Sequence, residues 1–194
     1  MKVAVASPVR GEVMKAKVCL VGEPAVGKSS LVRRFVYDQF GDIYHPSLGA
    51  KVSKKELDFR IGDRPVHAIL TIWDIMGEPA FRELLKDAYF SHLQGILAVG
   101  DLTRSKTIGA TTVWIDAACG VSGHIPIVVL GAKNDLHPEP DAPALIEEVA
   151  DQFAAPSWLT SAKTGTNVDR AFFSLADRIA RSGLRRGAPP ADPL

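Results

Sequence analysis

The sequence predicts an α/β fold: a three-layer domain with a six-stranded, mostly parallel sheet and helices on both faces. Two observations lead to this prediction. Apolar, β-branched runs alternate along the chain with segments whose apolar residues recur at helical spacing. A single hairpin signal, Ile61-Gly62-Asp63-Arg64, comes early, and only strand–helix units follow it. Helices that connect parallel strands cover both faces of a sheet, and such connections are right-handed.

The first half of the chain predicts three strands and two helices. The apolar run at about 16–22 forms the first strand, and the pattern from Ser29 to Val36 predicts a helix at about 28–40. Strands at about 49–60 and 66–74 flank the hairpin signal, so we expect them to pair with each other. A helix near 79–91 completes this half.

The second half predicts three strands, each followed by a helix. The strands are the apolar runs at 95–100 and 125–130 and a short segment at 157–160. Helices are expected near 105–122 and 141–153. The last helix is amphipathic, because these apolar residues recur at helical spacing: Val168, Phe172, Leu175, Ala176 and Ile179.

Length and charge predict one domain without nucleic-acid or membrane partners. A chain of 194 residues suits a single core at 16–182, with a flexible arm at 1–15 and a disordered, proline-rich tail at 183–194. The net charge of +1 gives no reason to expect nucleic acid as a partner. No apolar run approaches the roughly 20 residues that cross a bilayer.

Cysteine usage favours a cytoplasmic protein without a lipid anchor. Cys19 lies inside the first strand and is best explained as a reduced core residue of a cytosolic protein. The C-terminal residues 191–194 contain no cysteine that could be prenylated.

The loop between the first strand and the first helix carries the strongest motif. Residues 22–29 read G-x-x-x-x-G-K-S, and a strand–loop–helix setting is the context that this motif needs. Its glycines let successive N–H groups turn toward an anion, and the helix N-terminus adds free donors. Lys28 can reach the β- and γ-phosphates, and the hydroxyl of Ser29 can ligate Mg²⁺. The motif therefore predicts a nucleoside triphosphate site.

Other chemical residues follow the third, fifth and sixth strands, where ligands of such sheets bind. After the third strand, Asp74 can hold Mg²⁺ directly or through water, and Gly77 can bring its N–H against a γ-phosphate. After the fifth, Asp135 can accept from N1–H and the 2-amino group of guanine, a donor pair that adenine lacks. The stem of Lys133 can cover one face of the base.

After the sixth strand, the turn Ser161-Ala162-Lys163 offers N–H groups to the guanine carbonyl. Each of these pieces is common by chance, whereas all four in order, each at a strand end, form a strong pattern. Together they predict a guanine nucleotide as the ligand.

With these motifs the chain resembles the Ras-like small GTPases, most closely the Rab branch, over about residues 16–182. The resemblance implies the P-loop NTPase fold of small G proteins. It also implies that Mg²⁺ is held by Ser29, Ser47 and Asp74, and that Lys28, Gly77 and Glu78 act in catalysis. Counting forward from Lys28 without gaps places Phe40 where the family lays an aromatic ring over guanine. Tyr44 and Ser47 then fall at the tyrosine and the Mg²⁺-binding Thr of the first switch. The nucleotide-binding residues implied are Glu23, Pro24, Ala25, Val26, Gly27, Lys28, Ser29, Ser30, Phe40, Tyr44, Ser47, Gly77, Lys133, Asp135, Ser161, Ala162 and Lys163.

One departure from the family concerns nucleotide affinity. Ala132 stands where the family has an Asn or Thr that ties the base loop to the phosphate loop. Losing one or two hydrogen bonds costs roughly 1–3 kcal/mol, so affinity is expected to fall while guanine selection by Asp135 survives.

Further departures concern hydrolysis. Glu78 stands where the family has the glutamine that positions the attacking water, and a carboxylate cannot donate to the γ-phosphate. Pro79 restricts the backbone of Glu78. Pro24 and Ala25 replace small residues where an incoming arginine finger passes, and Pro24 also removes one N–H. Slow hydrolysis is the expectation.

The leading hypothesis is therefore a GTP/GDP molecular switch, a GTPase of slow intrinsic rate that requires Mg²⁺. Protein effectors and regulators are expected at the switch regions around 41–50 and 76–90, and the chain is expected to be a monomer. A nucleotide-locked interaction module that barely hydrolyses GTP is the alternative. A P-loop kinase or ATPase would need a second acceptor pocket and a lid, and no insertion provides them.

Overall fold

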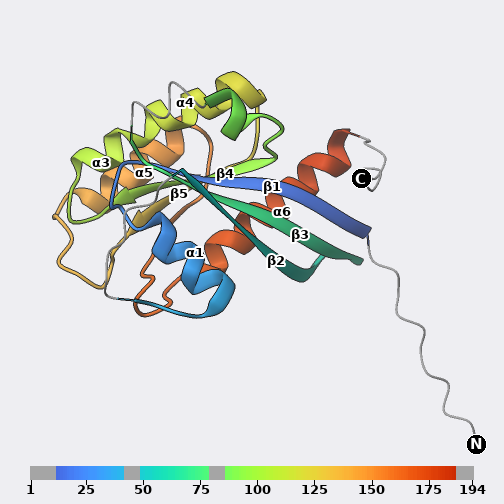
Figure 1. The fold of residues 1–194 in the computed structure, drawn as a ribbon, viewed down its shortest axis with the longest axis horizontal. Helices are drawn as coiled ribbons and strands as arrows, with labels where there is room; N and C mark the ends of the chain where they lie inside the picture. Colours follow the sequence, from blue (N-terminus) through green and yellow to red (C-terminus); the bar gives the residue numbers. More distant parts are fainter. Residues whose placement is uncertain (1–11, 42–48, 79–85, 187–194) are drawn as a thin grey trace, which may run out of the picture.

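The computed structural model describes residues 12–41, 49–78 and 86–186, and in these residues six strands form one sheet in the order β2-β3-β1-β4-β5-β6. Helices lie on both sides of the sheet (Figure 1). The elements are β1 (Glu12–Val21), α1 (Lys28–Tyr37), β2 (Ala50–Ile61), β3 (Arg64–Ile75), β4 (Gly95–Asp101), α3 (Lys106–Gly109), α4 (Thr111–Ser122), β5 (Ile127–Ala132), α5 (Ala142–Gln152), β6 (Ser157–Leu159) and α6 (Val168–Arg186).

The pairing confirms the predicted fold class. Strands β2 and β3 form an antiparallel hairpin that closes at the pair Ile61 and Arg64. All the other neighbours pair in parallel. Strands β1, β3, β4 and β5 therefore all end at one edge of the sheet, which is where the chain places its chemical motifs.

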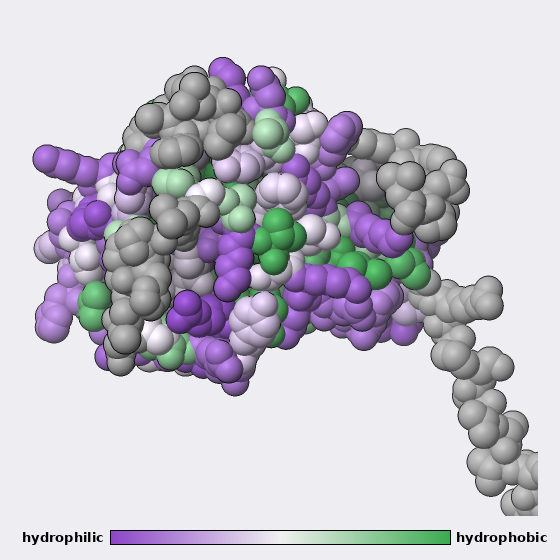
Figure 2. Space-filling view, in the orientation of Figure 1, coloured by the Kyte–Doolittle hydropathy of each residue, from purple (hydrophilic) through white to green (hydrophobic). Residues whose placement is uncertain are grey.

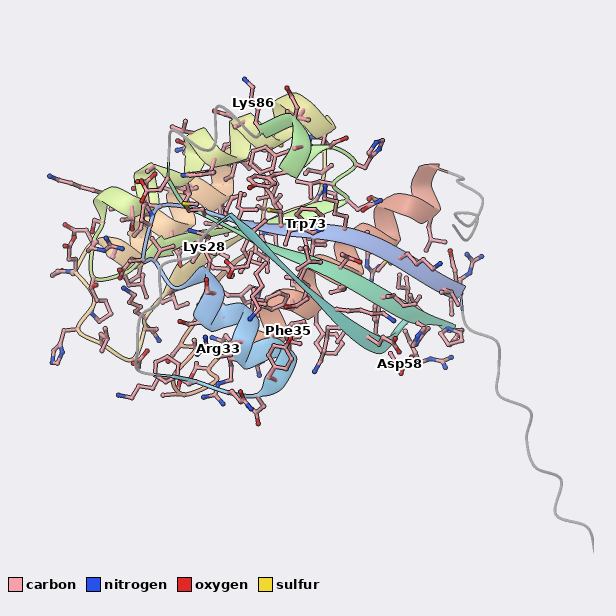
Figure 3. The ribbon with its side chains drawn as sticks, viewed as in Figure 1. Lys28, Arg33, Phe35, Asp58, Trp73 and Lys86 are labelled. Atoms are coloured by element: carbon pink, nitrogen blue, oxygen red, sulfur yellow. The ribbon has the colours of Figure 1, made fainter. Side chains whose placement is uncertain are left out.

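Two apolar layers hold the helices to the sheet. Side chains of β1 alternate between them: Val18 and Leu20 face α1 and α6, and Cys19 and Val21 face α3, α4 and α5. In the first layer the ring of Phe35 stacks on that of Phe172 with centroids 3.9 Å apart, which joins α1 to α6. Figure 3 shows Phe35 on the helix α1. The two elements that flank the phosphate loop, β1 and α1, are thus held in place by packed apolar side chains.

The folded domain is longer at both ends than the sequence predicted. Strand β1 begins at Glu12 instead of near 16, because residues 12–15 pair with β3 from Val66 onward. Residues 12–15 thus belong to the sheet and not to an arm. Helix α6 runs to Arg186 instead of ending near 182, since a glycine such as Gly183 costs a helix only about 1 kcal/mol. Residues 1–11 and 187–194 lie outside the described residues, so the arm and the tail stay predictions there.

Two helices also differ from the prediction. The first ends at Tyr37 instead of about 40, because Asp38 adopts a left-handed backbone with φ of 52°. The helix expected at 105–122 is divided into α3 and α4, which meet at Ala110. Of the helix expected near 79–91, residues 86–90 are helical, and residues 79–85 lie outside the described residues.

The surface seen in Figure 2 is mainly hydrophilic, with apolar residues in small groups. Within the described ranges, no helix has the length and apolar character that crossing a membrane requires.

We expect the contact between α1 and α6 to make a large contribution to stability. Phe172 is fully buried, whereas Phe173, the next residue on α6, is 38% exposed. Phe172→Ala should lower the free energy of unfolding by about 3–5 kcal/mol through the cavity it leaves. Phe173→Ala removes the same atoms and should cost about 1–2 kcal/mol, because Phe173 is partly exposed and makes one edge-to-face contact, with Phe59. Urea unfolding at a fixed nucleotide concentration measures both, and equal losses would contradict this packing.

Candidate functional site

The phosphate loop follows β1 and turns back into α1 through backbone conformations that favour glycine. Gly22 has a φ of 139° and Gly27 a φ of 111°. A Cβ atom added at Gly22 would lie 2.2 Å from the carbonyl oxygen of Val99, so only glycine fits against β4. Ala25 adopts a φ of 59°, which costs a non-glycine residue about 1–2 kcal/mol. The loop holds the tight curl that the motif predicts.

Lys28 lies at the start of α1, beside the ends of the central strands (Figure 3). Its side chain folds back over the loop, and Nζ donates to the carbonyl oxygens of Gly22 at 2.8 Å and Glu23 at 2.9 Å. Burial lowers the pKa of Lys28 to about 8, against the opposing effect of the Asp74 charge. The ammonium therefore predominates at neutral pH, which suits an anionic ligand.

Asp74, near the end of β3, is buried with 2% exposure. Burial raises the pKa of Asp74, while a hydrogen bond with Ser29 and the charge of Lys28 oppose that rise. Its Oδ1 atom is buried without a hydrogen-bond partner. An unsatisfied carboxylate oxygen beside a hydroxyl fits a hard divalent cation such as Mg²⁺.

In the described part of the chain, no three His, Cys, Asp or Glu side chains are grouped to hold a metal ion. A cation bound near Asp74 and Ser29 would therefore need further oxygen ligands from a phosphate or from water, which is how Mg²⁺ commonly binds at phosphate sites.

Gly77 is packed against the phosphate loop. A Cβ atom there would lie 2.6 Å from three atoms: the carbonyl oxygen of Gly22, the carbonyl carbon of Glu23 and Nζ of Lys28. The N–H of Met76, one residue earlier, donates to the carbonyl oxygen of Gly49 at 3.0 Å. The two expected switch regions are thus hydrogen-bonded to each other beside the loop, through Gly49 and Met76.

The predicted base-binding residues meet at the ends of β5 and β6. The hydroxyl of Ser161 donates to Oδ1 of Asp135 at 2.6 Å. The N–H of Asn134 donates to the carbonyl oxygen of Thr160 at 3.0 Å, and that of Thr164 to the hydroxyl of Ser161 at 3.1 Å. This arrangement fixes the direction of the Asp135 carboxylate.

Four predicted site residues are not placed in this cluster. Phe40 follows α1 and is 38% exposed. Tyr44 and Ser47 lie outside the described residues, so their predicted roles stay predictions. Glu78 is exposed directly after Gly77, at the end of the described range 49–78.

Sequence reasoning missed Arg34, which holds the turn predicted to bind the base from the opposite side. From α1, its Nε donates to the carbonyl oxygen of Ala162 at 2.7 Å and its Nη2 to that of Lys163 at 2.9 Å. An ion pair with Asp38 at 2.8 Å fixes the third guanidinium nitrogen. No local pattern marks this role of Arg34, because the carbonyls of Ala162 and Lys163 lie more than a hundred residues away in the sequence.

Trp114 is a second residue that the sequence did not connect to the site. It is fully buried on α4, and its Nε1 donates to Oε1 of Glu23 at 3.1 Å. The side chain of a phosphate-loop residue is thus fixed by a helix that lies some ninety positions later in the sequence.

A third missed group surrounds Asp101, the last residue of β4, which is fully buried. Its Oδ2 accepts from Nζ of Lys133 at 2.6 Å and from Nε of Arg104 at 2.8 Å. Burial alone would raise the pKa of Asp101, but hydrogen bonds from Lys133, Thr103 and Arg104 hold it below its ordinary value. Lys133 therefore directs its ammonium group to Asp101.

Comparison with known proteins agrees with this geometry. Residues 17–181 match the model of the Ras family. Human Ras-related protein Rab-4A is 33% identical over 168 residues, which cover 84% of this chain and 73% of that protein. Rab-13 from Mesocricetus auratus is 31% identical over 186 residues, 91% of this chain and 86% of the relative. Ras-related protein Ral-B from Rattus norvegicus is 31% identical over 176 residues, 88% of this chain and 82% of the relative.

The matched region coincides with the sheet and its helices, and Rab proteins stand among the relatives, as the motifs predicted. Phosphate-loop geometry, a buried acid near the end of β3, an Asp–Ser pair at the ends of β5 and β6 and this overall similarity all agree. The chain belongs to the Ras family.

Proposed function

We propose that this protein is a GTP/GDP molecular switch that hydrolyses GTP slowly with Mg²⁺. The observation that carries the proposal is the meeting, at one edge of the sheet, of a phosphate loop and the hydrogen-bonded pair Asp135 and Ser161. The first can hold the phosphates of a nucleotide, and the second can select its base.

Guanine selection follows from the chemistry of Asp135. Its carboxylate only accepts hydrogen bonds, so it suits the two donors on the Watson–Crick edge of guanine and repels the acceptors of adenine. Because Oδ1 already accepts from Ser161, the carboxylate is oriented before the ligand arrives. Such orientation reduces the entropy that binding must overcome.

Switching follows from the position of Gly77. Packed against Gly22 and Lys28, its N–H can meet a γ-phosphate that Lys28 also contacts. Ser47, with the segment around it, supplies the expected second hydroxyl for Mg²⁺. GTP would order both segments, and loss of the γ-phosphate would release them. Effectors and regulators would then recognise the regions around 41–50 and 76–90, with the protein a cytoplasmic monomer.

Slow hydrolysis follows from three residues. Water attack on GTP needs positioning and charge neutralisation, which Lys28 and Mg²⁺ can supply. Glu78 brings a negative charge to the place where a neutral donor would serve better, and Pro24 and Ala25 alter the passage for an arginine from a partner. When bound, Mg²⁺ neutralises charge on the phosphate oxygens.

A guanine-nucleotide-locked module is the second candidate, favoured by Glu78 and by the substitution at Ala132. Single-turnover hydrolysis of GTP distinguishes the two, because the switch clears bound GTP within hours and the locked module retains it. A P-loop kinase or ATPase would instead show competition by ATP against labelled GDP.

Base selection can be measured with a fluorescent guanine nucleotide. Asp135→Asn should weaken binding of mant-GDP about a hundredfold, equivalent to about 3 kcal/mol, because a charged acceptor of two hydrogen bonds is lost. Asp116→Asn, at an exposed position on α4, is the matched control and should bind as the native chain does. Equal affinities in the two variants would contradict a base-facing Asp135.

Removal of Mg²⁺ tests the metal site. A chelator should accelerate release of mant-GDP from the native protein by about tenfold or more, since the cation neutralises phosphate charge. Ser29→Ala should release the nucleotide rapidly even with Mg²⁺ present, and a chelator should add little. If the chelator accelerated release from Ser29→Ala as strongly as from the native protein, Ser29 would not be a metal ligand.

The role of Glu78 predicts a gain of activity. Glu78→Gln should raise the single-turnover rate of GTP hydrolysis by about tenfold or more, which corresponds to about 1.4 kcal/mol of the barrier. Glu147→Gln, exposed on α5, removes the same charge far from the loop and should leave the rate unchanged. A slower Glu78→Gln would show that the carboxylate itself assists the attack.

A further inference from the structure

Ala132 leaves the base loop without a direct side-chain link to the phosphate loop. It ends β5 with 2% exposure, and its methyl group lies 3.7 Å from the position that a Cβ atom on Gly27 would take. A methyl group there packs against the loop but can donate no hydrogen bond to it.

The neighbouring strand places a carboxylate beside this gap. Asp101 stands opposite Ala132 in the pairing of β4 with β5. Its Oδ1 accepts from the N–H and hydroxyl of Thr103 at 3.0 and 2.7 Å, and its Oδ2 accepts from Lys133 and Arg104. A fully buried carboxylate requires such partners. The two bonds to Oδ2 hold both cations, Lys133 and Arg104, in place.

Arg104 carries the connection onward to the phosphate loop. While its Nε donates to Asp101, its Nη2 donates to the carbonyl oxygen of Pro24 at 3.0 Å. The planar guanidinium presents both donors in a fixed geometry, so one side chain bridges a carboxylate and a backbone carbonyl. An unbroken series of hydrogen bonds then runs from Lys133 through Asp101 and Arg104 to Pro24.

The backbone that presents Arg104 is itself fixed. The N–H of Arg104 donates to the carbonyl oxygen of Asp101 at 2.9 Å, and the hydroxyl of Thr107 donates to that of Arg104 at 2.8 Å. At the next residue, the N–H of Ser105 donates to Oε2 of Glu139 at 3.0 Å. A turn held at both ends loses little further freedom when its side chain binds.

We infer that Asp101 and Arg104 are positioning residues that tie the phosphate loop to the base-binding loop, in place of the side chain that Ala132 lacks. The two loops hold opposite ends of one nucleotide, so fixing the distance between them slows its release. Pro24, which gives up an N–H, keeps a carbonyl that serves as the anchor of this tie. The inference rests on the proposed binding of guanine nucleotide.

The test measures dissociation of mant-GDP from the full-length protein in Mg²⁺. Arg104→Ala should accelerate release about tenfold, the effect of one charge-assisted hydrogen bond. Arg104→Lys keeps the charge but cannot bridge both acceptors, so its release rate should be intermediate, and it serves if Arg104→Ala does not fold. Arg60→Ala is the matched control, because Arg60 also donates to a backbone carbonyl, that of Asp63 at the β2–β3 turn, at 2.7 Å. Its release rate should equal that of the native protein.

Rescue separates a tie between the loops from a general loss of stability. In the A132N background the restored amide can link the loops directly, so adding R104A or R104K should change release by less than about threefold. Equal acceleration by R104A with and without A132N would show that Arg104 only stabilises its own turn, and would overturn the inference.

The remaining outcomes distinguish the inference from the function on which it rests. If the native protein binds mant-GDP and the R104A and R104K variants release it at the native rate, the tie is refuted while the proposed function stands. If the native protein does not bind mant-GDP, the proposed function fails and the tie fails with it.

Discussion

The close approach of the phosphate loop to strand β4 places every other part of the site. Because Gly22 has no side chain, its Cα can pack against the carbonyl of Val99, and a methyl group there would lie 2.2 Å from that oxygen. The loop then curls tightly enough for Lys28 to reach two carbonyls of its own loop. Gly77 fits against the same backbone for the same reason. Three chain segments thus meet where an anion can contact all of them.

Buried charge is the second constraint on this edge of the sheet. Lys28, Asp74 and Asp101 are all nearly inaccessible to water, and a lone buried charge is strongly unfavourable. Asp101 satisfies its oxygens within the protein, through Thr103, Lys133 and Arg104. Asp74 does not, because its Oδ1 lacks a partner. The first carboxylate therefore suits a structural role and the second a role with an added cation.

The departures from the family affect either the binding of the nucleotide or its hydrolysis. Ala132, taken alone, weakens the link between the two loops proposed to bind the nucleotide, and the series from Lys133 to Pro24 offers a substitute made of different residues. Among the residues that the structure describes, nothing comparable offsets Glu78, which is exposed beside Gly77. Contacts that would hold a nucleotide are therefore present. The neutral donor that would assist its cleavage is replaced by a charged residue.

By itself the sequence determined the order of the strands and helices and the residues at the strand ends. Lys28, Asp74, Gly77 and Asp135 were found because local patterns place such residues after β-strands, and parallel strands end at one edge. Only the tertiary structure revealed the roles of Arg34, Arg104 and Trp114, whose contacts with the loops of the site span about 80 to 130 residues. It also decided that β1 begins at Glu12, because a strand extends as far as its neighbour pairs with it. Local composition cannot indicate contacts that exist only once distant segments pack together.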